Sequence, residues 1–188
     1  MDSFIENNED DFYFSVKVPY GPIEFKEKGS RFISFIYPVR TADEAQKKIN
    51  QLKKEYHNAT HVCYAFRLGE GKEDSFRYND DGEPGNTAGL PIYNSIRNAE
   101  YFNVLVAVVR YFGGTKLGTG GLARAYSKSA RLIIKASENV KEWRTEEIVI
   151  TYPFDSTGDV MRIVKDFRLA NYCRWPAISA HQPKWIPR

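Results

Sequence analysis

The chain has few of the residues that build disulfide frameworks or zinc sites. Its 188 residues include only two cysteines, Cys63 and Cys173, which lie far apart and belong to no CxxC pair. Both kinds of framework need several cysteines, or cysteines and histidines, at short characteristic spacings. The sequence therefore argues against a disulfide scaffold and a zinc site, and it favours a reducing compartment.

Long apolar runs and a leader pattern are also missing. The longest purely aliphatic run, VLVAVV at 104–109, is much shorter than the roughly 20 residues that a membrane-spanning helix needs. The first residues show no basic stretch followed by an apolar one, which is the pattern of a signal peptide. We expect a soluble, cytoplasmic protein with no membrane partner.

Signatures of common enzymes and cofactors are equally sparse. No GxSxG elbow or nucleophilic Cys/His signature is present. Gly113 and Gly118 have the spacing of a phosphate-binding P-loop, but Thr119 stands where the lysine is needed. The segment GTGGLA (118–123) fits a loose dinucleotide-binding pattern, without the strand and acidic residue that should follow it. We expect no cofactor, with dinucleotide binding left as a minor alternative.

What the sequence does contain is an uneven distribution of charge. The net charge is only +3, in a chain that is 42% hydrophobic and 27% charged. Residues 1–11 carry five acids and no base, whereas residues 110–144 carry eight Lys or Arg against two Glu. The last 21 residues add four bases and no acid. This asymmetry predicts an electropositive surface on the C-terminal half.

Hydrophobic periodicity predicts alternating strands and helices. Thr41 and Glu44 form a capping box at the start of the clearest helix, in which Ala45, Ile49, Leu52 and Tyr56 share one face. Pro91 places the start of another helix near Gly89, because proline is tolerated only in a first turn. The predicted strands are 30–39, 60–69, 74–78, 101–112 and 145–154, and the predicted helices are 42–57, 89–98, 122–137 and 157–168.

An acidic loop, NDDGEPGNTAGLP at 79–91, brings three carboxylates together: Asp80, Asp81 and Glu83. Asp-Asp-Gly is typical of a turn, and the ligand pattern of a calcium loop is absent. A metal site with His61, or acid–base work by Glu83 with His61, stays open. The favoured interpretation is an ordered turn whose carboxylates orient Arg110 and also Lys116.

A glycine-rich segment, GGTKLGTGG at 113–121, follows the most apolar predicted strand and precedes a helix. Such a segment lets backbone N–H groups approach an anion, although it can also be only a tight connection. Along the helix, four cations fall on one side, either as a solvated face or as a phosphate-binding stripe: Arg124, Lys128, Arg131 and Lys135.

Taken together, DDGEPGNTAGLP, NVLVAVVRYFGGTKLGTGGLARAY, KGSRFISF (28–35) and HVCYAFRLG (61–69) resemble the IMPACT/YigZ family over roughly residues 20–137. The resemblance carries over two signature loops, without assigning any catalytic residue. The first comprises Asp80, Asp81, Gly82, Glu83, Pro84, Thr87 and Gly89, and the second comprises Arg110, Gly113, Gly114, Gly118, Gly120, Gly121 and Tyr126.

The resemblance also implies a fold and a domain division. The expected class is α+β, a two-layer mixed sheet with helices similar to the second domain of small-subunit ribosomal protein five. The expected divisions are an acidic tail (1–11), an IMPACT-type N-terminal domain (12–140) and an incomplete ferredoxin-like segment (141–188). Bacterial family members normally end in a complete ferredoxin-like domain, and too few patterned residues follow residue 145 to build one.

The expected function is that of a cofactor-free protein that binds RNA or ribosomes and influences translation, as eukaryotic family members are implicated in translational control. The expected binding residues, with no metal ligand and no catalytic residue among them, are Arg110, Gly113, Gly114, Lys116, Gly118, Gly120, Gly121, Arg124, Lys128 and Arg131. Two alternatives remain: a hydrolase or phosphoryl-transfer enzyme that uses the same glycine-rich segment, and a protein–protein adaptor in translational control.

Overall fold

A computed structural model describes residues 12–69, 74–143, 150–166, 172–175 and 184–187. The predicted acidic tail, residues 1–11, lies outside these described residues. The chain divides into two compact units, residues 1–144 and 145–188.

The first unit is built on a five-stranded sheet with the order β2-β3-β6-β4-β5. Its four strand pairs are all antiparallel. The strands are β2 (Tyr20–Glu27), β3 (Ser30–Pro38), β4 (His61–Leu68), β5 (Ser75–Asn79) and β6 (Val104–Tyr111). β6 lies at the centre of the sheet, as its almost continuous apolar sequence predicts.

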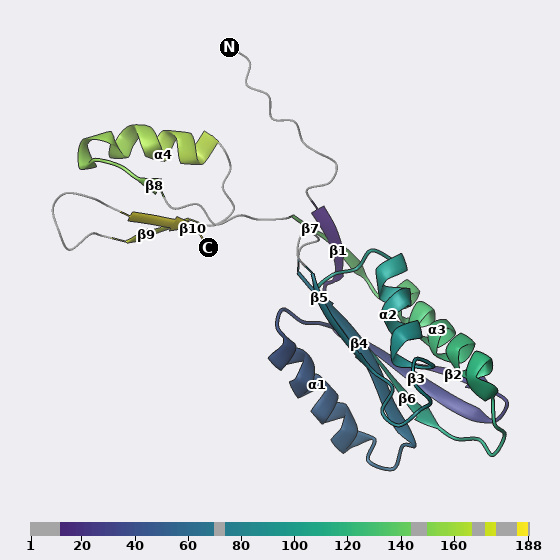
Figure 1. Cartoon of the computed structure of the whole chain (residues 1–188). Helices are drawn as coiled ribbons and strands as arrows, with labels where there is room; N and C mark the ends of the chain where they lie inside the picture. Colours follow the sequence, from purple (N-terminus) through teal and green to yellow (C-terminus); the bar gives the residue numbers. More distant parts are fainter. Residues whose placement is uncertain (1–11, 70–73, 144–149, 167–171, 176–183, 188) are drawn as a thin grey trace. The chain divides into compact units, whose positions relative to one another are not determined.

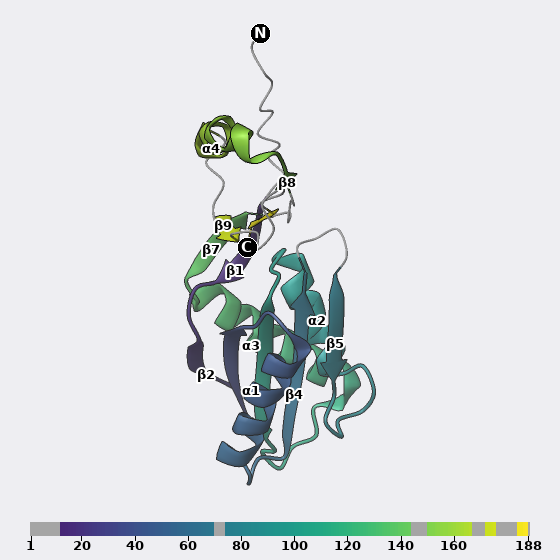
Figure 2. The same cartoon turned by 90° about the vertical axis from the view of Figure 1, so that its left-hand side faces the viewer.

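Helices cover both faces of this sheet (Figure 1). α1 (Ala42–Glu55) packs on one face, while α2 (Gly89–Asn98) and α3 (Gly118–Ala136) lie side by side on the other. Figure 2, turned by 90°, shows the same arrangement, with α1 in front of the strands. The α+β class is confirmed. The finer description was wrong in two respects, since the sheet is antiparallel and lies between two helix layers. Strands that are apolar on both faces, such as β6, require a cover on each.

The two faces of β6 supply two separate parts of the core. Val104, Val106 and Val108 face the cluster under α2 and α3, while Leu105 and Val109 face the cluster under α1. All five side chains are completely buried. Burial of each contributes about 1.5–3 kcal/mol, so this strand anchors both helix layers.

The start of α1 follows the predicted capping box with a small shift. The hydroxyl of Thr41 accepts from the Glu44 N–H at 3.2 Å, and the Glu44 carboxylate accepts from the N–H of Arg40 at 2.7 Å. The carboxylate thus reaches one residue further back than the cap itself. Three of the four predicted inner positions are buried: Ala45, Ile49 and Leu52.

Three strands of this unit lie outside the elements predicted from the sequence. β1 (Phe12–Val16) and β7 (Asn139–Trp143) form an antiparallel pair of their own, and β2 joins β3 through the tight turn Lys28–Gly29. The β1–β7 pair joins segments more than 120 residues apart, and local periodicity does not report such pairings. β7 also spans the expected division between residues 140 and 141.

The second unit contains β8 (Ile150–Thr151), α4 (Thr157–Asp166), β9 (Tyr172–Trp175) and β10 (Lys184–Pro187). Its three strands are antiparallel in the order β8-β10-β9. The connectivity is β-α-β-β, with the third strand between the first two. The sequence predicted no element at β9 or β10, because the prolines and tryptophans there show no regular period.

The helices of the described residues are too short or too polar to cross a lipid bilayer. Those in the first unit are amphipathic and carry their apolar side chains toward the sheet. The fold thus places α2, α3 and the two signature loops on a common side of the sheet, where the candidate site is found.

Candidate functional site

A row of side chains crosses the three central strands on the face under α3. Arg110 of β6 is paired with Phe32 of β3 on one side and with His61 of β4 on the other. Val108, two residues earlier on β6, belongs to the core under α2 and α3. Since alternate residues of a strand point to the same face, the guanidinium of Arg110 is directed toward that side.

Glu83 of the acidic loop lies over this row and forms a buried ion pair with Arg110. Its side chain is 3% exposed and that of Arg110 is 6% exposed. The same oxygen, Oε1, accepts a second hydrogen bond from the Tyr126 hydroxyl at 2.7 Å. Removing one partner of a buried ion pair costs about 3–5 kcal/mol, because the other charge stays buried and uncompensated. Glu83 therefore fastens the acidic loop to β6 and to α3.

The other contacts of Arg110 are aromatic and polar. Its guanidinium carbon lies 5.5 Å from the ring centre of Phe32 and 5.6 Å from that of Phe112. One Nη donates to the Ser30 hydroxyl at 3.3 Å. Nε is buried and has no hydrogen-bond partner among the described residues. The rings stabilise the cation, which is thus held within the fold.

Two protonated groups complete the buried cluster. The thiol of Cys63 is 3.3 Å from the Tyr126 hydroxyl and 3.1 Å from the backbone oxygen of Asp80. Burial raises the pKa of the Cys63 thiol, and the carboxylate of Glu83 raises it further. Burial likewise raises the pKa of the Tyr126 hydroxyl, with added contributions from Cys63 and Glu83. Both groups stay protonated at neutral pH and serve as hydrogen-bond donors.

Asp80 acts on the start of α2. Its carboxylate accepts hydrogen bonds from the backbone N–H groups of Asn86 at 2.8 Å, Ala88 at 2.9 Å and Gly89 at 2.8 Å. The first N–H groups of a helix have no partner inside the helix, and a negative charge there is favourable. Asp80 supplies that cap from outside the helix, because the local cap position, Ala88, has no side-chain acceptor.

Asp81 ties the acidic loop to the opposite side of β4. Its carboxylate pairs with Lys53 of α1 and accepts the N–H of Val62 at 2.7 Å. Its backbone oxygen lies 2.7 Å from Nδ1 of His61, so His61 Nδ1 donates to it. Nε2 of the same ring is 3.9 Å from Oε2 of Glu83. The hydrogen bond from Nδ1 orients the His61 ring, so that Nε2 lies nearest to Oε2 of Glu83. The other oxygen of Glu83, Oε1, binds Arg110 and Tyr126.

The remaining signature-loop residues close the turn. Gly82 is exposed and has a positive φ of 88°. The Thr87 hydroxyl donates to the backbone oxygen of Pro84 at 2.6 Å. The pairing of Glu83 with Arg110, expected from the sequence, is present. Lys116 is exposed instead, and Asp81 pairs with Lys53, which the sequence analysis did not consider. Within the described residues, no group of three or more His, Cys, Asp and Glu side chains is arranged to hold a metal ion.

The glycine-rich segment is shorter as a loop than the sequence predicted, because α3 begins at Gly118 instead of Leu122. Gly118, Gly120 and Gly121 thus lie in the first turn of the helix. Glycine has a low helix propensity, which is why the sequence suggested a loop. Gly118 has a positive φ of 71°, a conformation that glycine adopts readily. No side chain caps the start of this helix.

Gly113 has a packing role. A Cβ atom at this position would lie 1.8 Å from the backbone carbon of Gly29, in the β2–β3 turn. Only glycine allows two backbones to approach this closely. Part of the glycine content therefore serves to join β6 to the β2–β3 turn, and this turn brings Lys28 beside the start of α3.

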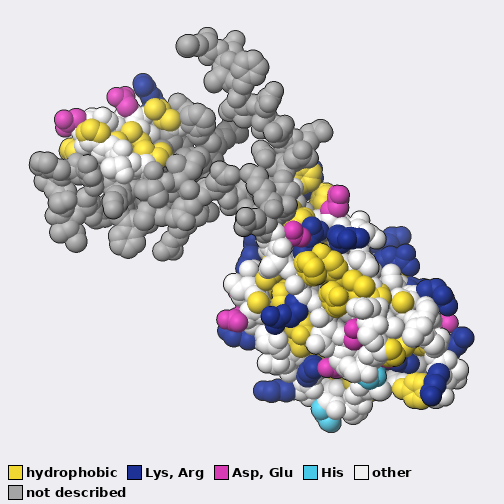
Figure 3. Space-filling model, in the orientation of Figure 1, with side chains coloured by type: hydrophobic (Ala, Val, Ile, Leu, Met, Phe, Trp, Pro, Cys, Tyr) yellow, Lys and Arg dark blue, Asp and Glu magenta, His cyan; other side chains and the backbone are white. Residues whose placement is uncertain are grey.

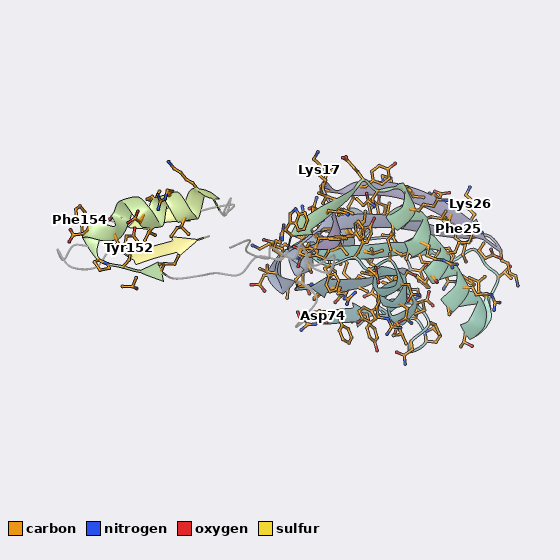
Figure 4. The ribbon with its side chains drawn as sticks, turned by 90° about the horizontal axis from the view of Figure 1, so that it is seen from above. Lys17, Phe25, Lys26, Asp74, Tyr152 and Phe154 are labelled. Atoms are coloured by element: carbon orange, nitrogen blue, oxygen red, sulfur yellow. The ribbon has the colours of Figure 1, made fainter. Side chains whose placement is uncertain are left out.

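A hollow of about 230 Å³ opens between the β2–β3 hairpin and the first turns of α3. Its apolar wall is formed by Phe25, Leu117 and Ala125, and Figure 4 shows Phe25 on β2 beside α3. Its charged lining consists of three cations and one acid: Lys28, Arg124, Lys128 and Glu27. Nζ of Lys128 lies 4.3 Å from the centre of the Phe25 ring. We call this feature the basic hollow.

The cations around the basic hollow take part in no ion pair among the described residues. Lys116, Arg124, Lys128, Arg131 and Lys135 are all exposed. No ion pair joins them to an acid within the described ranges. In Figure 3, Lys and Arg side chains follow the edge of the first unit along which α3 runs. The predicted outer stripe of this helix is thus present as an exposed basic surface.

Four members of the site were missed from the sequence: Phe25, Glu27, Lys28 and Lys53. The first three come from the β2–β3 hairpin. Lys28-Gly29 between alternating apolar residues is a signal for a tight hairpin, and it could have located this turn. Lys53 gave no such signal, because a lysine on the outer side of a helix is ordinarily a solvated residue.

These features define an α+β domain in which a buried acid–arginine pair joins two glycine-containing loops beside a basic surface. The family model described as the Impact N-terminal domain matches residues 28–134. That match covers more than half of the chain, which therefore belongs to the IMPACT family.

The chain is 45% identical to the IMPACT family member YvyE of Bacillus subtilis, over 62% of this chain and 53% of that protein. It is 35% identical to the IMPACT family member YigZ of Escherichia coli, over 58% of this chain and 55% of that protein. It thus spans about half the length of these relatives. A crystal structure of a hypothetical protein shares the fold, with a TM-score of 0.76, 21% identity, and coverage of 95% of this chain and 86% of that chain.

Proposed function

We propose that this protein binds RNA, free or within the ribosome, through the basic hollow and the exposed cations of α3, and that it influences translation by this contact. The proposed contacts are Lys28, Lys116, Arg124, Lys128 and Arg131, with the backbone N–H groups at the start of α3. Arg110 lies beneath this surface and supports it.

The main support for this proposal is that the charged residues of the acidic loop are paired inside the fold, whereas those around the glycine-rich segment are not. Asp80, Asp81 and Glu83 all accept hydrogen bonds or form ion pairs inside the fold. Arg124 and Lys116 stay exposed and unpaired within the described ranges. A cluster of unneutralised cations around a hollow attracts polyanions, and lysine and arginine contacts to phosphate need not depend on the base sequence.

The link to translation rests on the family. Eukaryotic members are implicated in translational control, and RNA is the polyanion that the translation machinery exposes. A protein partner in that control is compatible with the same surface. The proposed place of action is the cytoplasm, where that machinery works.

Co-sedimentation with ribosomes and with RNA tests this proposal, from about 50 to about 300 mM salt, a range over which several phosphate contacts lose most of their affinity. Arg124→Glu/Lys128→Glu should abolish binding at the low-salt end. Lys47→Glu/Lys54→Glu provides a matched control, because both lysines are exposed on α1, on the other face of the sheet. It should bind as the unaltered protein does.

The absence of binding even at the lowest salt would contradict the proposal. Equal losses in the two double variants would also contradict it, since the effect would then follow net charge and not the basic hollow. In either case small anionic ligands and hydrolase substrates would be tested next at the start of α3.

A further inference from the structure

A ladder of three aromatic rings lies at the edge of the sheet formed by β5. The rings of Phe76 and Tyr93 are stacked, with centroids 4.4 Å apart and an interplanar angle of 22°. Tyr78 continues the stack at 6.3 Å and 29° from Tyr93. Phe76 is 50% exposed, whereas Tyr93 is 8% exposed. Tyr93 is therefore the buried ring of the ladder, and Phe76 presents half of its surface to solvent.

This ladder lies on the side of the sheet that carries α2 and α3. Phe76 and Tyr78 are paired with Arg67 and Ala65 of β4, and Ala65 belongs to the core under these helices. In Figure 3, hydrophobic side chains gather on the surface over β5 and α2. β5 is the last strand of the sheet order, so that it has a single strand neighbour among the described residues. The rings thus lie along an edge strand of the sheet.

The two elements that carry the ladder, β5 and α2, contain no acidic residue. Arg97, in the last turn of α2, is exposed. Arg77 alternates with the two ladder residues of β5 and is paired with Phe66 of the core under α1, so its side chain is directed to the other face of the sheet. Asp74, which precedes β5 and is labelled in Figure 4, is already paired with Arg67. An exposed aromatic ring, stacked on a helix that carries an exposed arginine one turn further on, is suited to a ligand that combines flat rings with negative charge.

We propose that the aromatic ladder binds unpaired bases of a single-stranded RNA. This deepens the proposed function, on which it rests, by naming the class of RNA. A base that stacks on the exposed face of Phe76 continues the existing ladder, while Arg97, one turn after Tyr93 on α2, is available to its phosphates. Bases of a duplex are already stacked and paired, so they are not available to such a platform.

The two surfaces can be reached by one strand of RNA. α2 contacts β4 and β5, while α3 contacts β2 and β3, so the ladder and the basic hollow lie toward opposite edges of the sheet. Four spacings of about 4.8 Å separate the edge strands, which gives about 20 Å. A strand of several nucleotides spans that distance across α2 and α3. The basic hollow then supplies phosphate contacts and the ladder supplies base contacts.

The test compares two oligonucleotides of equal length and phosphate number by fluorescence anisotropy. One is a single-stranded RNA, and the other has an abasic residue at every position. Phe76→Ala should weaken binding of the RNA roughly 5- to 100-fold, the usual range for a lost base–aromatic stack. It should leave binding of the abasic strand unchanged. Phe76→Trp, which keeps a ring, should retain the RNA affinity.

Two further variants separate this inference from the proposed function. Arg124→Glu/Lys128→Glu should weaken binding of both strands, because it removes phosphate contacts. Phe154→Ala removes an aromatic side chain that is 65% exposed in the second unit, and it should change neither affinity. If the unaltered protein bound neither strand, the proposed function and this inference would fail together.

An RNA affinity within twofold of the unaltered value in Phe76→Ala would overturn the inference while leaving the proposed function intact. The exposed ring would then be assigned to a protein partner. Equal losses for the RNA and the abasic strand would overturn it as well, since they would show that Phe76 acts without contacting bases.

Discussion

The two signature loops use their charged residues in opposite ways. In the acidic loop, each carboxylate is bound by the fold: Asp80 caps α2, Asp81 pairs with Lys53, and Glu83 pairs with Arg110. Around the glycine-rich segment, Lys116 and Arg124 are exposed and unpaired within the described residues. The loops are neighbours in space, joined by one buried ion pair.

This difference separates a supporting loop from a binding surface. A carboxylate that accepts several internal hydrogen bonds stabilises the fold and is not free to bind an external cation. A cation without an internal partner contributes little to stability and remains free to attract an external anion. The acidic loop therefore holds β6, α2 and α3 in place, while the start of α3 faces the ligand.

The largest effect is expected for Glu83→Ala. It leaves Arg110 buried without its carboxylate and Tyr126 without its acceptor. The free energy of unfolding should fall by about 3–5 kcal/mol, measured by urea denaturation. Glu55→Ala, at an exposed position of α1, should change it by less than about 0.5 kcal/mol. A loss below about 1 kcal/mol in Glu83→Ala would show that the pair does not support the loop.

Replacement of Asp80 should have an intermediate effect. Asp80→Ala removes the acceptor of three backbone N–H groups at the start of α2. A lost helix cap costs about 0.5–2 kcal/mol, and hydrogen exchange of Ala88 and Gly89 should accelerate. Asp80→Asn should recover part of the stability. Unchanged exchange at these two amides would contradict the assigned role of Asp80.

Alkaline pH should destabilise the protein through buried and half-buried thiol and hydroxyl groups on both sides of the sheet. Burial raises the pKa of Cys63 and Tyr126, and it raises the pKa of Tyr37 to about 12. The folded state thus holds these protons more tightly than the unfolded state. Their contribution is complete below the ordinary values of 9.0 for cysteine and 10.0 for tyrosine, and it is lost as pH rises further.

Thermal unfolding between pH 7 and pH 12 measures this loss. The midpoint should change little up to about pH 8.5 and then fall steadily. Tyr126→Phe removes one of the buried acids, so its midpoint should depend less on pH in the alkaline range. A midpoint that stayed constant to pH 12 would show that these groups titrate alike in the folded and unfolded states.

The smallest effect on stability is expected at the glycine-rich segment. Lys116→Ala removes an exposed cation and should change the free energy of unfolding by less than about 0.5 kcal/mol. It should, however, reduce the slope of log affinity for RNA against log salt by about one. A marked loss of stability with an unchanged slope would reverse the assignment of the two loops.

The acidic loop could be predicted in part from the sequence. Asp-Asp-Gly marks the turn, Pro91 places the start of α2, and the pairing of Glu83 with Arg110 follows from an acid and a base in adjacent signature segments. The partner of Asp81 could not be predicted, since Lys53 lies on α1, 28 residues before Asp81. Such contacts depend on the tertiary fold and not on local pattern.

The basic hollow was harder to predict. The four cations of α3 follow from helical spacing, but Phe25 and Lys28 reach the site only through the β2–β3 hairpin. The early start of α3 was also missed, because three glycines in a first turn contradict helix propensity. In both cases the local structure is set by packing against β2, β3 and β6, and it differs from the structure that the local sequence favours.

The most direct test of the account measures single-stranded RNA affinity at about 50 mM salt for Arg124→Glu/Lys128→Glu and Asp80→Asn, at a temperature where circular dichroism shows both to be folded. We predict that the double variant loses at least tenfold in affinity, as expected when two phosphate contacts are replaced by repulsion, while Asp80→Asn binds as the unaltered protein does. The opposite result, with binding lost in Asp80→Asn and retained in the double variant, would contradict the division between a supporting loop and a binding surface.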